Sequence, residues 1–220
     1  MIMADARKVV RISDLHTQAY CEYQLNFQWK GVRIVSEQMQ NGTIKHEQLE
    51  AEHNERMKDA PKVTLDKAIE NTSIGKKSIG REVFIQSEGY GLIGKIDEIL
   101  ISPEGIFIID DKPTDFAYLS DKSQARAYAM CIESEYSNLI RENNLKIFSV
   151  IRNRDSKKIV WSEELTKDVT SETLEKIERI RKLAKGEIQF IPTTKPNKCR
   201  ACQYHKAGVC DRSAVSRSSS

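Results

Sequence analysis

Two apolar segments joined by a tight turn constrain the fold of this chain more than any other feature of its sequence. The segments are GLIGKIDEIL and GIFIIDDK, and SPEG at 102–105 separates them with the residue order of a type I turn. A two-residue loop would pair residues whose numbers sum to 207, which places Asp97 opposite Asp110. A three-residue loop with a bulge at Gly105 would place Asp111 opposite Asp97 instead. The hairpin therefore predicts a sheet that carries acidic residues within apolar strands.

The other segments extend this hairpin into a mixed sheet with helices packed on it, an α/β fold of the α+β type. EVFIQSE supplies a preceding strand, and KIFSVIRN and KKIVWSEE form a second hairpin. We expect one helix from Ser13 through Tyr23, with Cys21 inside it. The further expected helices are 43–58, 65–69, 119–141 and 171–185.

Composition excludes several classes of protein. With 220 residues, 39% hydrophobic and 30% charged, the chain suits one globular domain with a small appendage. No apolar run is long enough to cross a bilayer, and the N-terminus lacks the apolar stretch of a signal peptide. We therefore expect no membrane partner and a cytoplasmic location. Basic residues concentrate in 191–220, as expected of a solubilising tail or of a phosphate-facing surface.

Asp97, Asp110 and Lys112 are the first candidates for chemistry. Asp110 and Lys112 are two residues apart on a strand, so their side chains leave the same face. Two facing carboxylates can share a divalent cation, and a neighbouring ammonium can orient a water or stabilise charge, as phosphodiester hydrolysis requires. Gln124 and Tyr128 lie four residues apart on one face of the next helix and could add polar groups. A surface ion pair and an exposed helix face are the alternative interpretations.

The cysteines indicate a second metal site. In a reducing compartment they are thiols or metal ligands rather than disulfides. Cys199 and Cys202 form a CxxC pair, Cys210 follows, and Cys21 lies near the other end of the chain. These four thiolates suit an iron–sulfur cluster or a tetrahedral zinc, whereas His205 would complete a zinc site without Cys21. Spacing leaves both open. The fifth cysteine, on the predicted 119–141 helix, is expected to be a buried apolar residue.

Together these motifs resemble the RecB-like branch of the PD-(D/E)XK nucleases, most closely the CRISPR-associated exonucleases of the fourth Cas family. The resemblance runs from about Ile12 to Cys210 and rests on AYCEYQLNF, GTIKHE, GKIDEI, IIDDK, QARAY and CRACQYHKAGVC, in that order. It implies a PD-(D/E)XK, restriction-endonuclease-like core. The implied cation ligands are His46, Asp97, Asp110 and the carbonyl of Asp111. Lys112 would assist the attacking water, and Gln124 and Tyr128 would support the site or the DNA.

The resemblance also implies a function. The expected protein is a DNA exonuclease dependent on Mn²⁺ or Mg²⁺, acting on single-stranded DNA or single-stranded ends. It would process CRISPR spacer precursors beside other CRISPR adaptation proteins. Cys21, Cys199, Cys202 and Cys210 would hold a [4Fe-4S] cluster. The alternatives are a recombination or repair nuclease of the exonuclease V or AddB type, and a zinc-bearing nucleic-acid-binding module.

Two departures from the family accompany this resemblance. Asp110 stands where Glu is commoner, and Glu22 and Tyr23 replace the basic residue and proline expected beside the first cysteine. The expected organisation is an N-terminal helical segment (1–41) with one cluster cysteine and a nuclease core (42–168). A C-terminal helix with the iron–sulfur loop (169–212) and a disordered tail (213–220) would follow.

Overall fold

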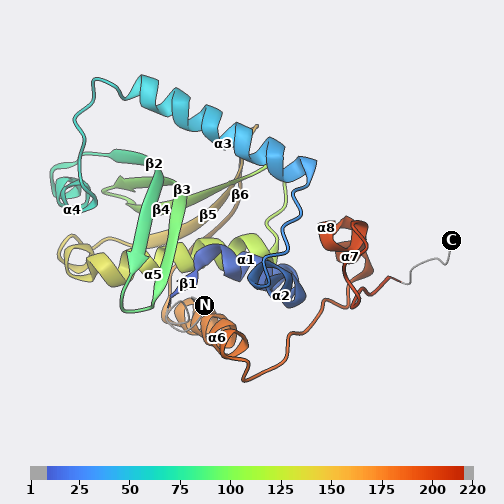
Figure 1. Ribbon diagram of the computed structural model, residues 1–220. Helices are drawn as coiled ribbons and strands as arrows, with labels where there is room; N and C mark the ends of the chain where they lie inside the picture. The colour runs from blue at the N-terminus through green and yellow to red at the C-terminus, as the bar shows by residue number, and fades with distance from the viewer. Residues whose placement is uncertain (1–8, 216–220) are drawn as a thin grey trace.

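A mixed β-sheet forms the centre of the molecule (Figure 1). The computed structural model describes residues 9–215, without the side chains of 37–39 and 46. Within that range the sheet has six strands in the order β1-β3-β4-β5-β6, with β2 on the other edge of β3. The β1–β3 and β4–β5 pairs are parallel and the others antiparallel. The strands are β1 Val10–Arg11, β2 Ser78–Ser87, β3 Leu92–Ser102, β4 Gly105–Lys112, β5 Ile147–Asn153 and β6 Ile159–Glu164.

The β3–β4 hairpin has the register that its turn predicts. Ser102 pairs with Gly105 across a two-residue loop, and the pairing continues to Glu98 opposite Ile109. The alternative loop with a bulge at Gly105 is therefore wrong. Past the Glu98–Ile109 pair the two strands separate, and Val10 of β1 pairs with Leu92 at the start of β3. Asp97 and Asp110 stand one residue beyond the last paired position.

Helices cover the two sides of the sheet unequally. In Figure 1, α5 and α1 lie below the strands with α6 beyond them, whereas α3 crosses above. Because β4 and β5 pair in parallel, the chain between them must cross over, and α5 makes this connection. The helices are α1 Ile12–Tyr20, α2 Glu22–Trp29, α3 Glu37–Arg56, α4 Leu65–Glu70, the 3₁₀ helix η1 Asn71–Ile74, α5 Leu119–Glu142, α6 Lys167–Lys185, α7 Pro196–Ala201 and α8 Gln203–Lys206.

Three helix boundaries correct the sequence-based expectations. Cys21 adopts an extended conformation that separates α1 from α2, so the single helix predicted through it is wrong. This break lets the carboxylate of the next residue, Glu22, accept the backbone N–H of Ile191 at 2.9 Å. The helix expected to follow Gly42 already begins at Glu37. The last long helix begins at Lys167, because the Thr166 side chain caps it by accepting from the Val169 N–H.

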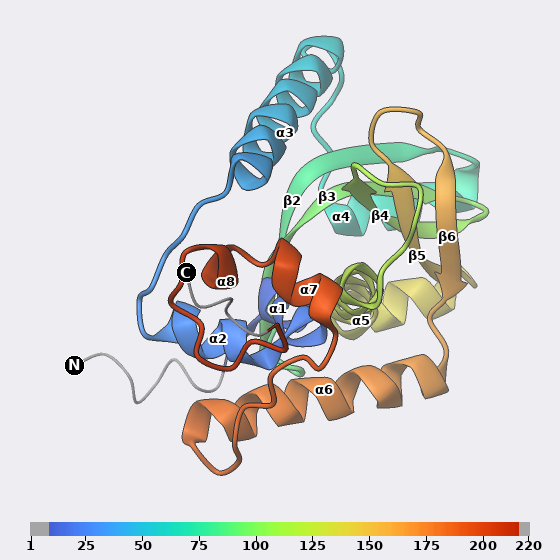
Figure 2. The same ribbon diagram turned by 90° about the vertical axis from the view of Figure 1, so that its right-hand side faces the viewer.

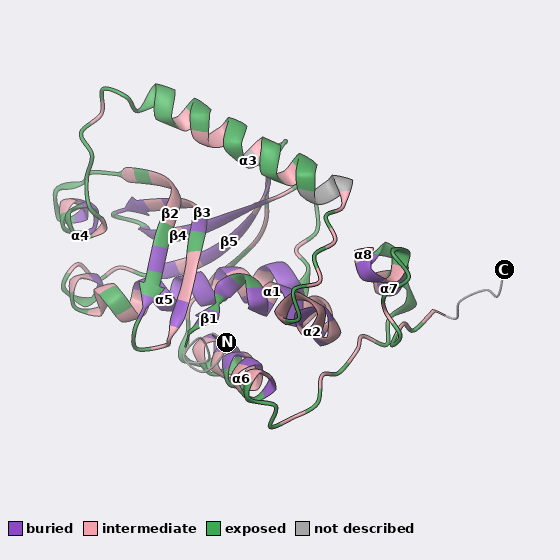
Figure 3. Cartoon of the chain, in the orientation of Figure 1, coloured by how far each residue is buried: buried purple, intermediate pink, exposed green. Residues whose placement is uncertain are grey.

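One hydrophobic core joins the sheet, α1, α5 and α6 (Figure 3). It extends from Val10 to Leu183 along the chain and includes Cys131, which is fully buried, as the sequence predicted for that cysteine. The short helices α7 and α8 lie beside α2 in both Figure 1 and Figure 2. There the ring of Tyr204 stacks on Phe27 with centroids 4.7 Å apart. Over residues 9–215, no helix is long and apolar enough to cross a membrane.

Candidate active site

Asp97, Asp110 and Lys112 come together where β3 and β4 separate. Lys112 Nζ lies 2.9 Å from Asp110 Oδ2. Asp97 Oδ2 accepts the backbone N–H of Asp111 at 3.1 Å, which ties β3 to β4 just past their last ladder pair. Asp110 is buried, and its Oδ2 meets no hydrogen-bond donor in good geometry among the described residues, despite the nearby ammonium. The three predicted residues thus share one site with spare acceptor capacity.

The electrostatics of this site favour an additional positive charge. Burial and then the neighbouring Asp110 carboxylate raise the pKa of Asp97 well above its ordinary value. Burial alone would lower the pKa of Lys112, but Asp110 and Asp97 outweigh it and raise that pKa. Lys112 is therefore an ammonium close to two carboxylates, and these carboxylates repel each other when both acids are ionised. A divalent cation is the ligand that such a pair of oxygen donors suits.

Gln124 and Tyr128 face the same site from α5. Gln124 Nε2 donates to Tyr128 Oη at 3.4 Å. Burial first, and then the Asp97 and Asp110 carboxylates, raise the pKa of Tyr128 to about 12, so its hydroxyl stays protonated at neutral pH. A Cβ at Gly94 would stand 2.7 Å from the Tyr128 ring, so β3 needs glycine there to admit this side chain. The predicted pair therefore lies near the two carboxylates rather than on an exposed helix surface, and its role in the site stays a prediction.

Asp111 points to the other face of β4. Its carboxylate accepts two hydrogen bonds from Arg152, at 2.8 and 2.9 Å, and one from Arg81 at 3.1 Å. Glu98 completes this buried charge cluster by accepting from the same two arginines, at 2.6 and 2.7 Å. Burial would raise the pKa of Asp111, but the hydrogen bonds and charges of Arg152 and Arg81 lower it overall. The Asp111 side chain is thus fully paired, and its backbone alone faces Asp97.

Sequence reasoning missed the arginines of this buried charge cluster. Both stand within strands, Arg81 on β2 and Arg152 on β5, where a charge needs a partner. The parallel register sets Arg152 beside Asp111 and the antiparallel register sets Arg81 beside Glu98. The signal in the sequence was a charged residue within each of the strands β2 to β5. These residues are recognised as neighbours only once the order of the strands in the sheet is known.

The remaining predicted cation ligand, His46, lies on α3, and its side chain is outside the described residues. Among the side chains that the structure does describe, no three His, Cys, Asp or Glu residues are arranged to hold a metal ion. Asp97 and Asp110 supply two such side chains. Their burial and their mutual repulsion fit a divalent cation held by these two carboxylates together with backbone oxygen.

The four cysteines predicted to act together line one pocket between α2 and the α7–α8 segment. Tyr20, Phe27, Lys198 and His205 also line it, whereas Cys131 is in the distant core. These sulfurs accept hydrogen bonds: Cys202 from Gln24 Nε2 at 3.1 Å, and Cys21 from the Thr193 N–H at 3.3 Å. Such donors are typical of the surroundings of metal-bound thiolates.

Two charged side chains, Glu22 and Lys198, connect the chain segments around this cysteine pocket. Glu22, one of the departures from the family pattern, forms an ion pair with Arg179 of α6 and accepts the Ile191 N–H. Lys198 donates to the carbonyls of Ala19 and Tyr20, both at 3.0 Å, at the C-terminal end of α1. At least this basic residue of the 191–220 region therefore serves neither a solubilising tail nor a phosphate. The two chain segments that carry the cysteines are fixed to each other.

One solved structure shares the overall fold of this chain. A crystal structure from Eubacterium rectale named "Putative exonuclease" matches with a TM-score of 0.53 and 15% identity over 96% of this chain and 92% of that chain. A second crystal structure, named SSO0001, matches at 16% identity over 93% of this chain and 86% of that one. Its TM-score of 0.47 is too low to support an argument. No curated protein sequence matches the chain significantly.

The family comparison covers most of the sequence. The family model described as the PD-(D/E)XK nuclease superfamily matches residues 32–211, a range that contains both strands of the site and the C-terminal cysteines. The mixed sheet with its flanking helices is consistent with the core of that superfamily, and the solved structure with the higher TM-score shares the fold. This chain therefore belongs to the PD-(D/E)XK nuclease superfamily.

Proposed function

We propose that this protein is a divalent-cation-dependent DNA exonuclease that acts on single-stranded DNA or on single-stranded ends. The observation that carries the proposal is the convergence of Asp97, Asp110 and Lys112 at one buried point of the sheet. Membership in a nuclease superfamily favours a phosphodiester as substrate over a purely nucleic-acid-binding role.

The residues of the site would have different roles in the reaction. Asp97, Asp110, the Asp111 carbonyl and His46 would hold Mn²⁺ or Mg²⁺, which when bound polarises the phosphate and activates water. Lys112 keeps its proton beside two carboxylates and so acts as a fixed positive charge toward the developing charge on the phosphate. The Tyr128 hydroxyl and the Gln124 amide offer donors to the substrate or to ordered water.

For the cysteine pocket we propose a [4Fe-4S] cluster on Cys21, Cys199, Cys202 and Cys210. Its support is that all four thiols line one pocket and that the sulfurs of Cys21, Cys199 and Cys202 accept hydrogen bonds from nearby N–H groups. Zinc on Cys199, Cys202, His205 and Cys210 is the second candidate. A specific observation favours it, because Nδ1 of His205 is buried without a hydrogen-bond partner among the described residues.

The biological role we propose is the trimming of CRISPR spacer precursors, beside other CRISPR adaptation proteins. A recombination or repair role of the exonuclease V or AddB type would use the same chemistry. The support for the first is the order of the sequence motifs, with one cysteine before the nuclease strands and three after them.

The proposed activity is tested with end-labelled single- and double-stranded DNA, with Mn²⁺, with Mg²⁺ and with neither. We expect cation-dependent shortening of the single strand from an end by the wild type, and none by Asp97→Asn. Asp66→Asn, the same substitution on the exposed surface of α4, is the matched control and should cleave like the wild type. Cleavage by the Asp97→Asn protein at the wild-type rate would contradict the assignment.

A further inference from the structure

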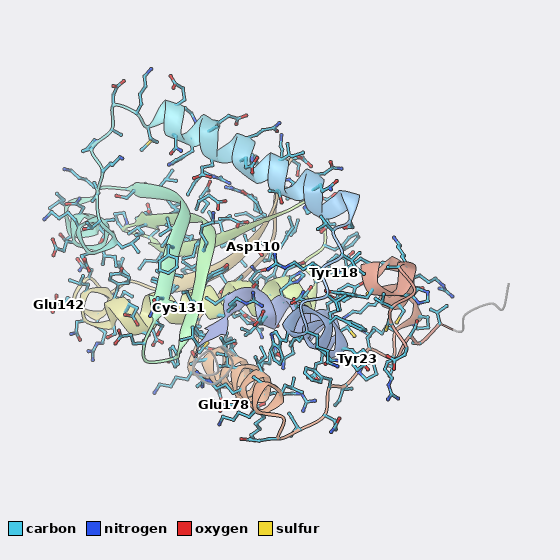
Figure 4. The ribbon with its side chains drawn as sticks, in the orientation of Figure 1. Tyr23, Asp110, Tyr118, Cys131, Glu142 and Glu178 are labelled. Carbon is cyan, nitrogen blue, oxygen red and sulfur yellow. The ribbon has the colours of Figure 1, made fainter. Side chains whose placement is uncertain are left out.

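Three apolar side chains stand exposed where the chain passes from β4, the strand with Asp110 and Lys112, into α5. Phe116 is 71% exposed, Tyr118 57% and Leu119 58%, and they follow Lys112 within seven positions along the chain. Isolated exposed apolar residues are common, but three within four positions form a patch, and such patches mark binding surfaces. Figure 4 labels Tyr118 at the N-terminal end of α5, together with Asp110 on β4. We call Phe116, Tyr118 and Leu119 the exposed aromatic patch, after the two rings that it contains.

The backbone under the exposed aromatic patch is held in place. Asn153 Nδ2 donates to Asp115 Oδ1 at 2.8 Å, and the Thr114 hydroxyl donates to the Phe116 carbonyl at 2.9 Å. The Tyr118 N–H donates to Asp121 Oδ2 at 3.1 Å, which fixes the start of α5. A surface fixed in this way loses little entropy when a ligand settles on it.

Cationic and aromatic side chains continue the patch. Lys122 lies one helical turn after Tyr118, on the same side of α5. Its ammonium lies 5.0 Å from the centre of the Trp161 ring on β6. An apolar protein partner covering this surface would have to strip water from Lys122 at a cost. A nucleic-acid strand offers both partners at once, since its bases can stack on the rings and its phosphates can pair with the ammonium.

We propose that the exposed aromatic patch stacks unpaired bases of the DNA strand that enters the Asp97–Asp110 site. The inference rests on the proposed nuclease function and adds the groups that select the substrate. A base within a duplex is covered on both faces by its neighbours and cannot stack on Phe116 or Tyr118. An unpaired base leaves a face free, so the patch discriminates in favour of single strands and frayed ends.

Binding without turnover tests the proposal. The probes are a fluorescein-labelled oligothymidylate of about 20 nucleotides and an abasic oligonucleotide of equal length and charge. Anisotropy is measured in EDTA for the wild type, for the Phe116→Ala/Tyr118→Ala double variant and for Ile74→Ala. Ile74 is a suitable control because it is 66% exposed and follows α4, away from the N-terminal end of α5 (Figure 1).

The expected result is selective. The wild type and Ile74→Ala should bind oligothymidylate about tenfold or more tightly than the abasic strand, and the double variant should bind both equally weakly. Equal oligothymidylate affinity in the wild type and the double variant would overturn the stacking role, as would a wild type without preference. A wild type that dimerises through Phe116 and Tyr118 would also overturn it, by showing a second copy as the occupant.

The nuclease assay separates this proposal from the one it rests on. Wild-type protein that cleaves DNA but fails the stacking test overturns only the patch. Wild-type protein that neither cleaves nor binds DNA overturns both. Melting temperatures of the double variant and the wild type should differ by no more than the loss of the Tyr118 side chain from the N-cap of α5, because both side chains are exposed. A larger loss would assign them a structural role instead.

Discussion

At the scale of single residues, the two acidic pairs of the sheet differ in how their charges are balanced. Asp111 and Glu98 meet two arginines and form a neutral set. Asp97 and Asp110 lie close to the Lys112 ammonium and oppose each other's ionisation. Two carboxylates that repel each other in a buried place are costly, and a cation held by both would remove that cost. This pair is the one to which we assign the cation.

The first prediction concerns stability without metal. At neutral pH an ionised Asp97 opposes folding, because its pKa is raised in the folded protein by burial and by Asp110. Asp97→Asn removes this repulsion and keeps an oxygen that can accept the Asp111 N–H. In EDTA the variant should melt a few degrees above the wild type, as expected for about 1 kcal/mol in a chain of this size. Thermal denaturation followed by circular dichroism measures this, and a lower melting temperature would contradict it.

The second prediction concerns Lys112. A fixed charge that meets the substrate mainly in the transition state contributes to turnover more than to binding. Lys112→Ala should therefore lower kcat by about 100-fold or more, with a much smaller change in DNA affinity. Single-turnover cleavage and equilibrium binding of the same oligonucleotide separate the two effects. Equal losses in both would reduce Lys112 to a phosphate contact.

At the scale of elements, β4 presents two different sites on its two faces. Asp110 and Lys112 face the candidate active site, whereas Asp111 between them faces the buried charge cluster. The Asp111 backbone N–H in turn holds Asp97. Arg152 therefore holds the strand that carries the candidate active site from its far side, through Asp111 and without contact to Asp110 or Lys112.

The third prediction is a pH dependence of this cluster. Arg152 and Arg81 lower the pKa of Asp111, so the stability it contributes is present above about pH 4, the ordinary range of Asp. That contribution is lost as the pH falls through the lower pKa of the folded protein. Asp111→Asn should cost about 3–5 kcal/mol at neutral pH, because it leaves buried guanidinium charge unpaired.

Melting temperatures of Asp111→Asn and the wild type at a series of pH values test this prediction. The difference between the two proteins should narrow as the solution is acidified below about pH 4. Asp66→Asn on α4 serves as control, and its difference from the wild type should stay small throughout. A constant difference for Asp111→Asn would show that its carboxylate does not act through its charge.

The sequence predicted correctly those features of the fold that depend on residues close together along the chain. The SPEG turn determined the β3–β4 register, and with it the position of Asp97 relative to Asp110. The break at Cys21 could not be predicted in this way, because the contacts that accompany it join Glu22 to Ile191 and Arg179 far along the chain. The partners of Asp111 were missed for the same reason, since Arg152 becomes its neighbour only through the parallel β4–β5 pairing.

At the scale of the whole molecule, the cysteine pocket joins the two ends of the described chain. Cys210 follows Cys21 by 189 positions, yet both line the same pocket. A shared metal centre would close nearly the whole chain into one loop and so stabilise the fold by restricting the unfolded state.

The fourth prediction tests which metal centre this is. With four cysteine ligands, Cys21→Ala should lose iron, the brown colour and thermal stability much as Cys202→Ala does. His205→Ala should keep the metal under that model and lose it if zinc is bound. Cys131→Ala is the matched control and should keep metal and colour, because this thiol lies in the core. Metal analysis and visible absorption of anaerobically purified protein distinguish the two models. Full metal content in Cys21→Ala, together with loss of the metal in His205→Ala, would contradict the four-cysteine cluster and indicate a zinc site that does not include Cys21.

The placement of the cysteine pocket at both ends of the chain also sets an order of events during synthesis. At about 5–20 residues added per second, roughly 10–40 s pass between the making of Cys21 and of Cys210. In that interval the core from Val10 to Leu183 emerges and can fold. Cys21 is then already present, but the later cysteines that line the same pocket have not yet been made. Whatever the pocket binds is therefore inserted after the nuclease core has been translated, and an oxidant that reaches the early thiol first would prevent it.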